Sequence, residues 1–463
     1  MMNGRLKIVF LTPGTGGWYC GACMRDNALA KSLQAAGHDV SLLPMYLPLM
    51  LDEEVLDNGH VAPVFFGGIN MYLQQKIAAF RHVPERLCQL LDHPRLLRRV
   101  ARHSHMTSAR DHGELTLAML RMENRRFDKS LDPLITWLKQ ESPDILCLST
   151  ALQAGLIRTL KHHLNVKIIC CFQGEDSFLD GLPAPFHDAC WHELALRVRE
   201  ADALVSPSAF YADLMNQRLG PGKMMISVIP NGIDLRGYSP LTVKPGPPVI
   251  GFLARMTQEK GLEILVDAFI HLRTVLGHPD ALLHLAGAAT PENQALIESL
   301  QLRLTAAGLA DQARWQTNLS RDEKTEMLRS LTLFSVPAIY QEAFGLYVIE
   351  ALASGVPVVQ PATAAFPEII KTAGVGVLVP FVHHDPQDTQ PSHSASPSPN
   401  PNSIALAQAW LECLQQPNKL PGLAAASRRA AEQFYDVSVM RDHFLELARA
   451  ISGVTGGPSS PSI

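Results

Sequence analysis

The feature that most limits the fold of this chain is a regular alternation of short apolar runs with longer amphipathic segments. Such alternation predicts a parallel β-sheet with helices on both of its faces. A predicted helix over 26–36 follows the first run and a glycine-rich turn. The predicted strands of the first half are 6–11, 40–43, 145–149, 166–172 and 203–206.

The second half repeats this scheme after a stiff break at Pro245-Gly246-Pro247-Pro248. A chain of 463 residues is too long for one ordinary core. We therefore predict an α/β protein with two Rossmann-like domains, 1–235 and 236–435, then a terminal helix at 436–451 and a flexible tail at 456–463. The predicted strands of the second half are 249–253, 282–286, 333–336, 356–359 and 375–379, with a helix from about 262.

Two segments depart from the alternation. Residues 77–130 are rich in Arg and His and place Leu at helical spacing, which predicts a helical insertion. Its basic face either meets solvent or meets an anionic acceptor or membrane headgroups. Residues 383–403 are of low complexity and are predicted to form a disordered loop.

Composition argues against several classes of protein. The net charge of −4 argues against nucleic acid as the main partner. No run reaches the roughly 18 apolar residues of a membrane span. The apolar run 8–11 stops at Pro13-Gly14, which indicates a strand and turn rather than a signal peptide. Eight cysteines without a disulfide-scaffold pattern favour reduced thiols and a cytoplasmic location.

The strongest chemical signal is the segment 337–351, where two carboxylates, Glu342 and Glu350, stand eight positions apart. The first lies in a predicted loop and the second in a helix predicted to begin near residue 344. Free amides at a helix start favour an anionic ligand such as a diphosphate, and a glycine there lets the backbone approach it. These amides belong to Phe344, Gly345 and Leu346.

A second signal is a predicted strand that runs into a loop with two cations, Arg255 and Lys260. Phosphate groups carry negative charge, and fixed cations in a partly dry site stabilise that charge better than water does. Arg offers a planar fork and Lys a point charge, so the two can bind different phosphate oxygens.

Two turns complete the motifs. Ile229-Pro230-Asn231-Gly232-Ile233-Asp234 precedes the predicted domain boundary. The turn after the first strand contains Gly14, Gly16 and Gly17, which do not give the Gly-x-Gly-x-x-Gly spacing of a dinucleotide fingerprint.

Together these motifs resemble those of the family-4 retaining glycosyltransferases of the GT-B fold. The pair of glutamates resembles the family's Glu-x7-Glu signature, and 251–261 is similar to its Arg…Glu-Lys-Gly loop. The resemblance implies two Rossmann-like domains facing a central cleft. It also implies that Glu342 contacts the donor sugar, that Glu350 binds the nucleotide ribose, and that Arg255 and Lys260 bind the diphosphate.

The resemblance extends to the turns and to the reaction. It implies that Gly16 and Gly17 face the donor phosphates and the acceptor, that Asn231 contacts the donor, and that the terminal helix crosses back onto the first domain. It further implies transfer with retention at the anomeric carbon. No metal or other cofactor is expected, because Arg255, Lys260 and the helix amides replace a divalent ion and the sequence has no Asp-x-Asp motif.

Two places depart from the family pattern. Cys20 and Cys23 form a Cys-x-x-Cys, which is compatible with structural thiols, a redox function or half of a metal site. Gln173 stands where many members have a histidine that contacts the donor sugar. After it, Glu175 and Asp176 either bind acceptor hydroxyls or cap the following helix.

We therefore expect a glycosyltransferase with a nucleotide-sugar donor and an unidentified acceptor, which is a glycan, a lipid-linked molecule or a small molecule. Peripheral contact with a membrane is compatible with the basic segment. The alternatives are a GT-B sugar phosphorylase or epimerase, or a non-catalytic nucleotide-sugar sensor in which Cys20 and Cys23 form a redox or metal switch.

Overall fold

In the computed structural model the chain forms two compact units. The N-terminal unit contains the chain up to Gly232 and the segment from Val437 onward, and the C-terminal unit is Ile233–Asp436. The boundary between Gly232 and Ile233 lies close to the predicted domain boundary at residue 235. The structure describes residues 4–14, 21–46, 49, 51, 53–56, 109–122, 125–240, 246–382 and 400–453.

The N-terminal unit contains a six-stranded parallel sheet in the order β2-β1-β3-β4-β5-β6. Its central strands β1, β3 and β4 are largely apolar runs, since helices cover a parallel sheet on both faces. In β1, for example, Ile8–Leu11 are all buried. The strands are β1 (Lys7–Thr12), β2 (Asp39–Pro44), β3 (Ile145–Leu148), β4 (Lys167–Cys171), β5 (Ala203–Ser206) and β6 (Ile226–Val228).

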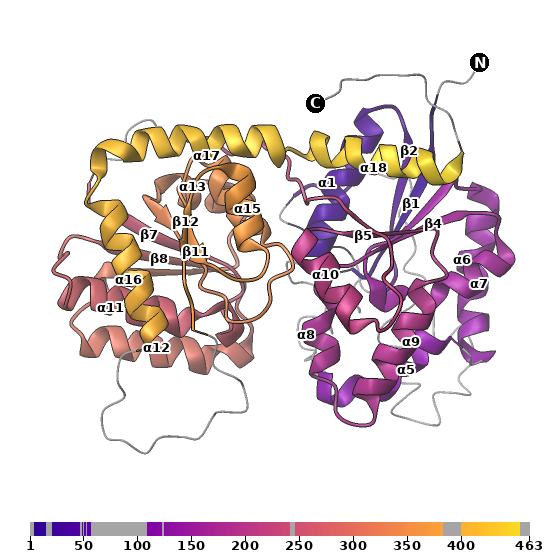
Figure 1. The fold of residues 1–463 in the computed structure, drawn as a ribbon, viewed down its shortest axis with the longest axis horizontal. Coiled ribbons are helices and arrows are strands. Elements are labelled where there is room, and N and C mark those ends of the chain that lie inside the picture. Colours follow the sequence, from indigo (N-terminus) through magenta and orange to yellow (C-terminus); the bar gives the residue numbers. More distant parts are fainter. Residues whose placement is uncertain are drawn as a thin grey trace. The chain divides into compact units, whose positions relative to one another are not determined.

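The last of the described helices, α18, belongs to the core of the N-terminal unit. It lies beside α1 (Figure 1), and its Phe444 stacks on Phe10 of β1 with ring centroids 5.7 Å apart. The terminal helix thus packs on the first domain, as the family resemblance implied. The helices in the described part of this unit are α1 (Gly21–Ala35), α5 (Ala109–Arg121), α6 (Arg125–Glu141), α7 (Leu156–His163), α8 (Glu175–Asp180), α9 (Phe186–Val198), α10 (Ala209–Arg218) and α18 (Val437–Ser452).

The C-terminal unit has a four-stranded sheet, β10-β7-β8-β9, and a parallel pair, β11-β12. A parallel bridge between Phe334 and Val358 connects the two. The resulting order, β9-β8-β7-β10-β11-β12, is the 3-2-1-4-5-6 order of a doubly wound Rossmann sheet. The strands are β7 (Val249–Leu253), β8 (Leu282–Gly287), β9 (Ala313–Thr317), β10 (Leu333–Phe334), β11 (Val359–Pro361) and β12 (Val377–Val379).

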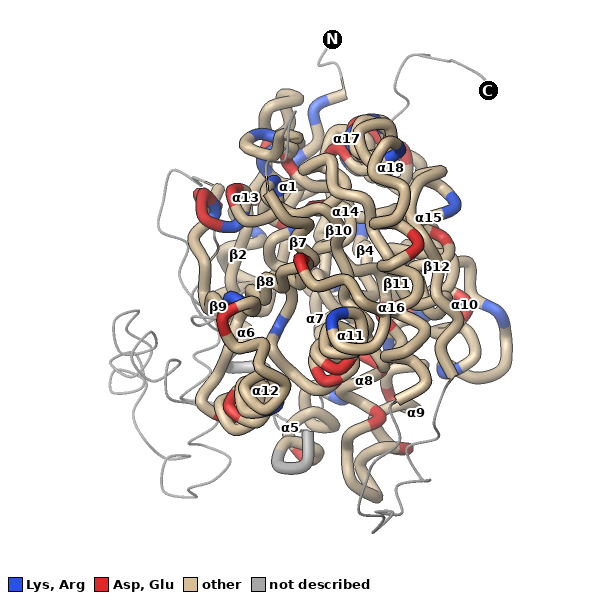
Figure 2. The backbone as a smooth tube through the Cα atoms, turned by 90° about the vertical axis from the view of Figure 1, so that its left-hand side faces the viewer, with Lys and Arg blue, Asp and Glu red and all other residues tan. Residues whose placement is uncertain are grey.

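The helices of the C-terminal unit cover this sheet, and they contain many of the charged residues of the unit. Figure 2 shows charged residues on α11, α12 and α13, whereas β8 and β10 contain none. Trp410 of α16 donates a hydrogen bond to Ser335 after β10, at 2.8 Å, which fixes that helix to the sheet. The helices are α11 (Leu262–Thr274), α12 (Gln294–Ala306), α13 (Arg321–Ser330), α14 (Leu346–Ala353), α15 (Phe366–Ala373), α16 (Pro401–Leu414) and α17 (Leu420–Phe434).

Several predicted boundaries were wrong. Helix α1 begins at Gly21 rather than 26, and α14 begins at Leu346 rather than 344. The predicted loop 383–403 overlaps α16, because Pro401 is a favoured first residue of a helix and Asn400 caps it. Its residues 383–399 lie outside the described part, as do 77–108 of the predicted insertion and the tail 456–463; residues 109–121 and 125–130 are helical.

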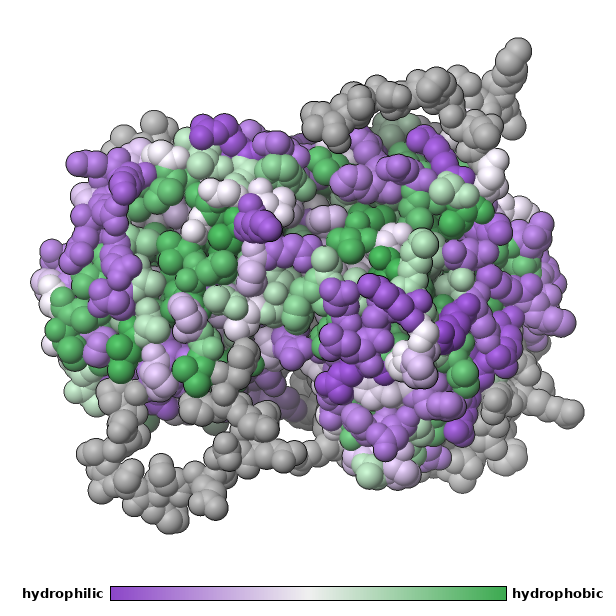
Figure 3. All heavy atoms as spheres, in the orientation of Figure 1, coloured by the Kyte–Doolittle hydropathy of each residue, from purple (hydrophilic) through white to green (hydrophobic). Residues whose placement is uncertain are grey.

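The surface of each unit mixes polar and apolar side chains. Figure 3 shows hydrophilic and hydrophobic residues interspersed on the face that it draws, as is usual for domains in contact with water. No helix within the described ranges combines the length and the apolar character that a bilayer crossing requires.

Candidate active site

The predicted motifs of the C-terminal unit meet where its strand order reverses. Strands β7 and β10 are neighbours, and the chain leaves them toward opposite sides of the sheet order. Ligands of doubly wound sheets bind at this switch point, beside the carboxyl ends of the strands. Arg255 and Lys260 follow the carboxyl end of β7, and Glu342 follows that of β10. The topology therefore brings two distant motifs to one edge of the sheet.

Lys260 and Glu342 form a buried ion pair at this edge. The Nζ atom of Lys260 lies 2.6 Å from Oε2 of Glu342 and 2.6 Å from the hydroxyl of Tyr340. Tyr347 donates a hydrogen bond to the same Oε2, also at 2.6 Å. Lys260 is 6% exposed and Glu342 is 9% exposed. Lys260, which is predicted to bind the diphosphate, and Glu342, which is predicted to contact the sugar, thus neutralise each other in this structure.

Aromatic rings surround the Lys260 ammonium group. Its Nζ lies 4.7 Å from the ring centroid of Tyr340 and 5.0 Å from that of Tyr347. Ring faces attract a cation, and they do so more strongly where water is excluded. Both tyrosines stand within the motif segment 337–351, so their proximity to Glu342 in the sequence was the signal that could have identified them.

The charges of this pair affect its titration. Burial alone raises the pKa of Glu342, but the charge of Lys260 and hydrogen bonds from Lys260 and Tyr347 outweigh it, so the pKa lies below its ordinary value. Burial, together with the negative charge of Glu342, raises the pKa of Tyr347 well above its usual range. Tyr347 therefore remains a protonated donor to an ionised carboxylate.

The lowered pKa of Glu342 makes a prediction about acid stability. A carboxylate whose pKa is lower in the folded state than in the unfolded state stabilises the folded state. For Glu342 this contribution is fully present at a pH above 4.5, the ordinary pKa of a glutamate, and it is lost as the pH falls through the lower pKa of the folded state. We expect Glu342→Gln to be less stable than the wild type at pH 7, with the gap narrowing below pH 4.5. Urea unfolding midpoints across this range measure the gap, and a constant gap would contradict the prediction.

Arg255 differs from Lys260 in its surroundings. Its side chain is exposed and forms no hydrogen bond or ion pair with another described residue. Arg255 and Lys260 both follow β7, and Arg255 comes first in the chain. It therefore stands at the same edge of the sheet. A free guanidinium at this position is suited to binding phosphate oxygens in pairs.

Gly261 lets the Lys260 loop approach the segment that leads to Glu342. Its φ of +72° lies in the left-handed region, and a Cβ atom built there would come within 1.8 Å of the carbonyl oxygen of Pro337. The backbone of the first motif therefore lies directly against the backbone of the second. Only glycine fits this contact without displacing one of the two loops.

We expect Gly261→Ala to be more destabilising than Gly277→Ala. Both glycines have φ near +70°, but a Cβ at Gly277 meets no atom within 4 Å. Gly277→Ala therefore costs only the left-handed conformation, about 1–2 kcal/mol, and Gly261→Ala adds the collision with Pro337. Chemical denaturation measures both. Equal losses would show that the loops separate freely.

Glu350 lies in α14 and is held by two donors that sequence reasoning did not identify. Its Oε1 accepts hydrogen bonds from the Tyr238 hydroxyl and from Nζ of Lys324, each at 2.7 Å. Neither donor belongs to a motif, so the sequence offered no signal for them. The helix itself begins after Gly345, whose φ is +94°, and Phe344 and Leu346 flank that residue. Tyr347 connects this helix start to Glu342.

The structure gives Glu175 of the N-terminal unit a role that neither prediction named. Its Oε1 accepts hydrogen bonds from the Thr150 hydroxyl at 2.7 Å and the Ala151 amide at 2.9 Å. Its Oε2 accepts from the Gln173 amide at 2.8 Å and the Tyr211 hydroxyl at 3.2 Å. The side chain therefore joins the loop after β3 to the loop after β4, and it does not cap α8.

The remaining predicted residues of this unit have varied surroundings. Asp176 accepts a hydrogen bond from the Tyr211 hydroxyl at 2.8 Å, and burial raises the pKa of this carboxyl group. Gln173 is half-buried after the carboxyl end of β4, and Asn231 is buried at the end of the unit. Gly16 and Gly17 lie outside the described residues.

The Cys-x-x-Cys is described only in part. Cys20 lies outside the described residues, whereas Cys23 is buried in α1 and accepts a hydrogen bond from the Thr12 hydroxyl at 3.2 Å. Within the described part of the chain, no three His, Cys, Asp or Glu side chains gather in a way that would hold a metal ion.

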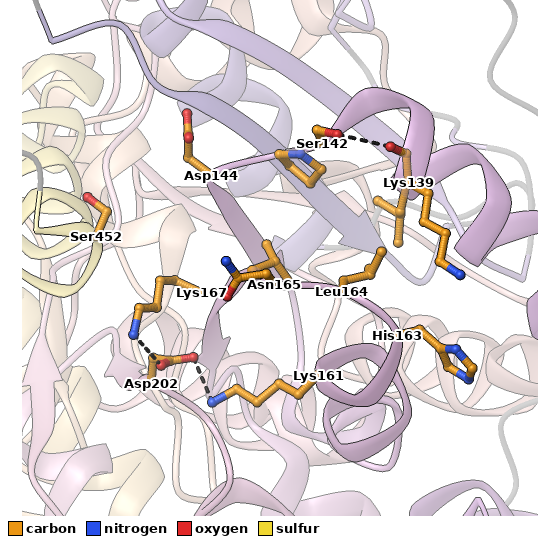
Figure 4. Close-up of a pocket in the computed structure, with 13 residues that line it drawn as sticks. Lys139, Ser142, Asp144, Lys161, His163, Leu164, Asn165, Lys167, Asp202 and Ser452 are labelled. Carbon is orange, nitrogen blue, oxygen red and sulfur yellow. Dashed lines mark hydrogen bonds and ion pairs between the residues drawn. The ribbon is translucent and has the colours of Figure 1, made fainter.

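A hollow of about 640 Å³ opens elsewhere on the N-terminal unit (Figure 4). Asp144, Lys167 and Asp202 line it, and they stand at the amino ends of β3, β4 and β5. Asp202 pairs with Lys161 at 2.7 Å and with Lys167 at 3.2 Å. Because ligands of parallel sheets bind at the opposite edge, this hollow is not part of the candidate site.

Comparison with known protein families places the chain. The family model Glycosyltransferase Family 4 matches residues 101–236, and the model Glycosyl transferases group 1 matches residues 239–388. Together the two models cover more than half of the chain. The chain belongs to the family-4 glycosyltransferases. The second match contains Arg255, Lys260, Glu342 and Glu350, which are the residues at the switch point of the C-terminal sheet.

Curated relatives of this family-4 glycosyltransferase match over part of their length. A glycogen synthase of Mycobacterium tuberculosis is 30% identical over 182 residues, which cover 39% of this chain and 42% of the relative. A phosphatidyl-myo-inositol mannosyltransferase of the same species is 28% identical over 230 residues, 49% of this chain and 54% of the relative. The chain thus spans about half the length of the curated relatives that it matches.

Solved structures match the fold of nearly the whole chain. Sucrose-phosphate synthase from Thermosynechococcus elongatus gives a TM-score of 0.68 at 16% identity, covering 97% of this chain and all of the other. Anabaena HepE in complex with UDP gives 0.63 at 16% identity, covering 96% and 100%. These likenesses confirm the predicted GT-B fold class with its two Rossmann-like units.

Proposed function

We propose that this glycosyltransferase transfers a sugar from a nucleotide-diphosphate sugar to a hydroxyl acceptor, with retention at the anomeric carbon and without a divalent metal ion. The buried pair of Lys260 and Glu342 carries this proposal, beside Arg255, which pairs with no other described residue. Lys260 and Arg255 supply cations for a diphosphate, and Glu342 supplies a carboxylate for sugar hydroxyls. All three stand at the edge of the sheet where the ligands of Rossmann folds bind. The structurally similar HepE was solved in complex with UDP, which supports a nucleotide donor.

The residues would divide the work as follows. Arg255 and Lys260 bind the diphosphate and stabilise the charge that it gains as the bond between the anomeric carbon and the phosphate oxygen breaks. Lys260 then exchanges its contact with Glu342 for a phosphate oxygen, and Glu342 accepts hydrogen bonds from the donor sugar. The acceptor oxygen forms the new bond to the same carbon, and its proton passes to the departing diphosphate.

Metal independence follows from this division. A divalent ion in metal-dependent glycosyltransferases neutralises the leaving phosphates, and here the two basic side chains and the amides at the start of α14 would do so.

The six described cysteines are all free thiols, which supports a cytoplasmic location. The relatives include a glycogen synthase and a phosphatidyl-myo-inositol mannosyltransferase, so the acceptor class stays open to a glycan, a lipid-linked molecule or a small molecule.

Donor binding and slow donor hydrolysis test the proposal. UDP-, GDP- and ADP-sugars are titrated with EDTA present, and the anomer of the released sugar is followed by NMR. We expect one donor to bind, EDTA to have no effect, and the first sugar released to keep the donor's configuration. Binding of no nucleotide sugar, together with release of sugar phosphate from a glycan and inorganic phosphate, would instead indicate a phosphorylase.

A further inference from the structure

The two carboxylate oxygens of Glu350 are in different states. Oε1 accepts hydrogen bonds from the Tyr238 hydroxyl and the Lys324 ammonium group, each at 2.7 Å. No described residue donates to Oε2, and this atom is not sealed from solvent. A carboxylate oxygen can accept two hydrogen bonds, so Oε1 is fully used and Oε2 is available to a ligand.

The two donors are themselves held in place. Lys324 lies in α13. A reciprocal capping box between Ser320 and Glu323 stabilises the N-terminus of this helix. The guanidinium of Arg321, in the same helix, lies 5.4 Å from the ring centroid of Tyr238. Tyr238 is 4% exposed and Lys324 is 7% exposed, so neither side chain is free to change its rotamer. The orientation of the Glu350 carboxylate is therefore imposed by two other elements of the C-terminal unit.

We infer that Lys324 and Tyr238 are positioning residues that turn Oε2 of Glu350 toward the ribose hydroxyls of the nucleotide. This inference rests on the proposed function and on the role of ribose binding that the family resemblance implies for Glu350. Lys324 also supplies the countercharge that a buried carboxylate needs. Because no described residue donates to Oε2, a nucleotide that lacks its ribose hydroxyls forgoes this charge-assisted hydrogen bond and binds more weakly than the form with ribose.

A purely structural role for the cluster makes a different prediction. Loss of Lys324 would then weaken every nucleotide to the same degree, because the whole unit would be perturbed. A positioning role instead changes the preference between a nucleotide and its analogue without ribose hydroxyls. The ratio of the two dissociation constants therefore separates the roles.

Calorimetric titration measures this ratio with the full chain in EDTA. The probes are UDP, GDP and ADP and their 2′,3′-dideoxy counterparts, and the tightest-binding pair is used for all variants. We expect the wild type to prefer the ribose form by about 10- to 100-fold, which is the value of one or two hydrogen bonds to a charged group. Lys324→Met should reduce the preference to about threefold or less, and Lys324→Arg should restore part of it.

Two further variants keep the test decisive. Tyr238→Phe removes one donor without changing charge or volume, and it should lower the preference even if Lys324→Met does not fold. Lys371→Met, at an exposed lysine of the same unit, should leave the preference unchanged.

The outcomes distinguish the inference from the proposed function. A wild type that binds a nucleoside diphosphate but shows no ribose preference, or keeps its preference in both variants, overturns the inference alone. A wild type that binds none of the three nucleoside diphosphates overturns the proposed function, and the inference with it.

Discussion

Replacing Lys260 with methionine is expected to lower kcat/KM for the nucleotide-sugar donor by about 100- to 1000-fold. Methionine keeps the length of the side chain but removes the charge that pairs with Glu342 and stands at the predicted diphosphate position. The leaving diphosphate would then develop its charge against Arg255 without a second cation from this loop. Steady-state hydrolysis or transfer of the donor identified by screening measures the effect, and Lys371→Met is the matched control.

The same substitution leaves the Glu342 carboxylate buried without its cation. Breaking one side of a buried ion pair costs about 3–5 kcal/mol, so Lys260→Met should also be less stable. The double variant Lys260→Met with Glu342→Gln removes both charges and should regain much of that stability while staying inactive. A double variant that regains activity would show that Lys260 serves only to neutralise Glu342.

The second large effect is expected for Glu342→Gln, which should lower kcat for the donor sugar by about 100-fold. The amide keeps the shape of the side chain but gives up one acceptor oxygen and the negative charge. Lys260 is then released from its partner at 2.6 Å and becomes available to phosphate. The affinity for the nucleoside diphosphate without sugar should therefore stay the same or rise.

This opposite behaviour of turnover and product binding is specific to a carboxylate that contacts the sugar. Calorimetry with the nucleoside diphosphate and steady-state kinetics with the donor measure the two quantities. Glu298→Gln, at an exposed position of α12, serves as the control. If Glu342→Gln weakened the diphosphate as much as the donor sugar, Glu342 would act only through Lys260.

Strands that are buried on both faces were predictable from sequence because their apolar runs are continuous. The predictions for β5 (Ala203–Ser206) and β7 (Val249–Leu253) agree with the structure at both ends. The short strand β6 and the edge strand β9 were missed, because their residues are half-buried or exposed and the apolar signal is weak. Sequence patterns report burial, and these two strands are held by pairing with a neighbour instead.

The site shows the same division. Arg255, Lys260, Glu342 and Glu350 were identified from motifs, because charged residues at fixed spacing around a glycine turn are a local property of the chain. The partners of these residues were not. Lys260 and Glu342 are separated by 82 positions, and Glu350 is separated from Tyr238 by 112.

The sequence by itself thus determined the alternating α/β pattern, the two Rossmann-like units and the residue types available for a diphosphate and a sugar. Only the tertiary structure decided which of those residues face each other. It paired Lys260 with Glu342, left Arg255 without an ion-pair partner among the described residues, joined Glu175 to two loops and held Glu350 by Lys324 and Tyr238. The physical reason is that a charge or a hydrogen bond acts over a few ångströms in space, and only the order of the strands sets which distant residues come that close.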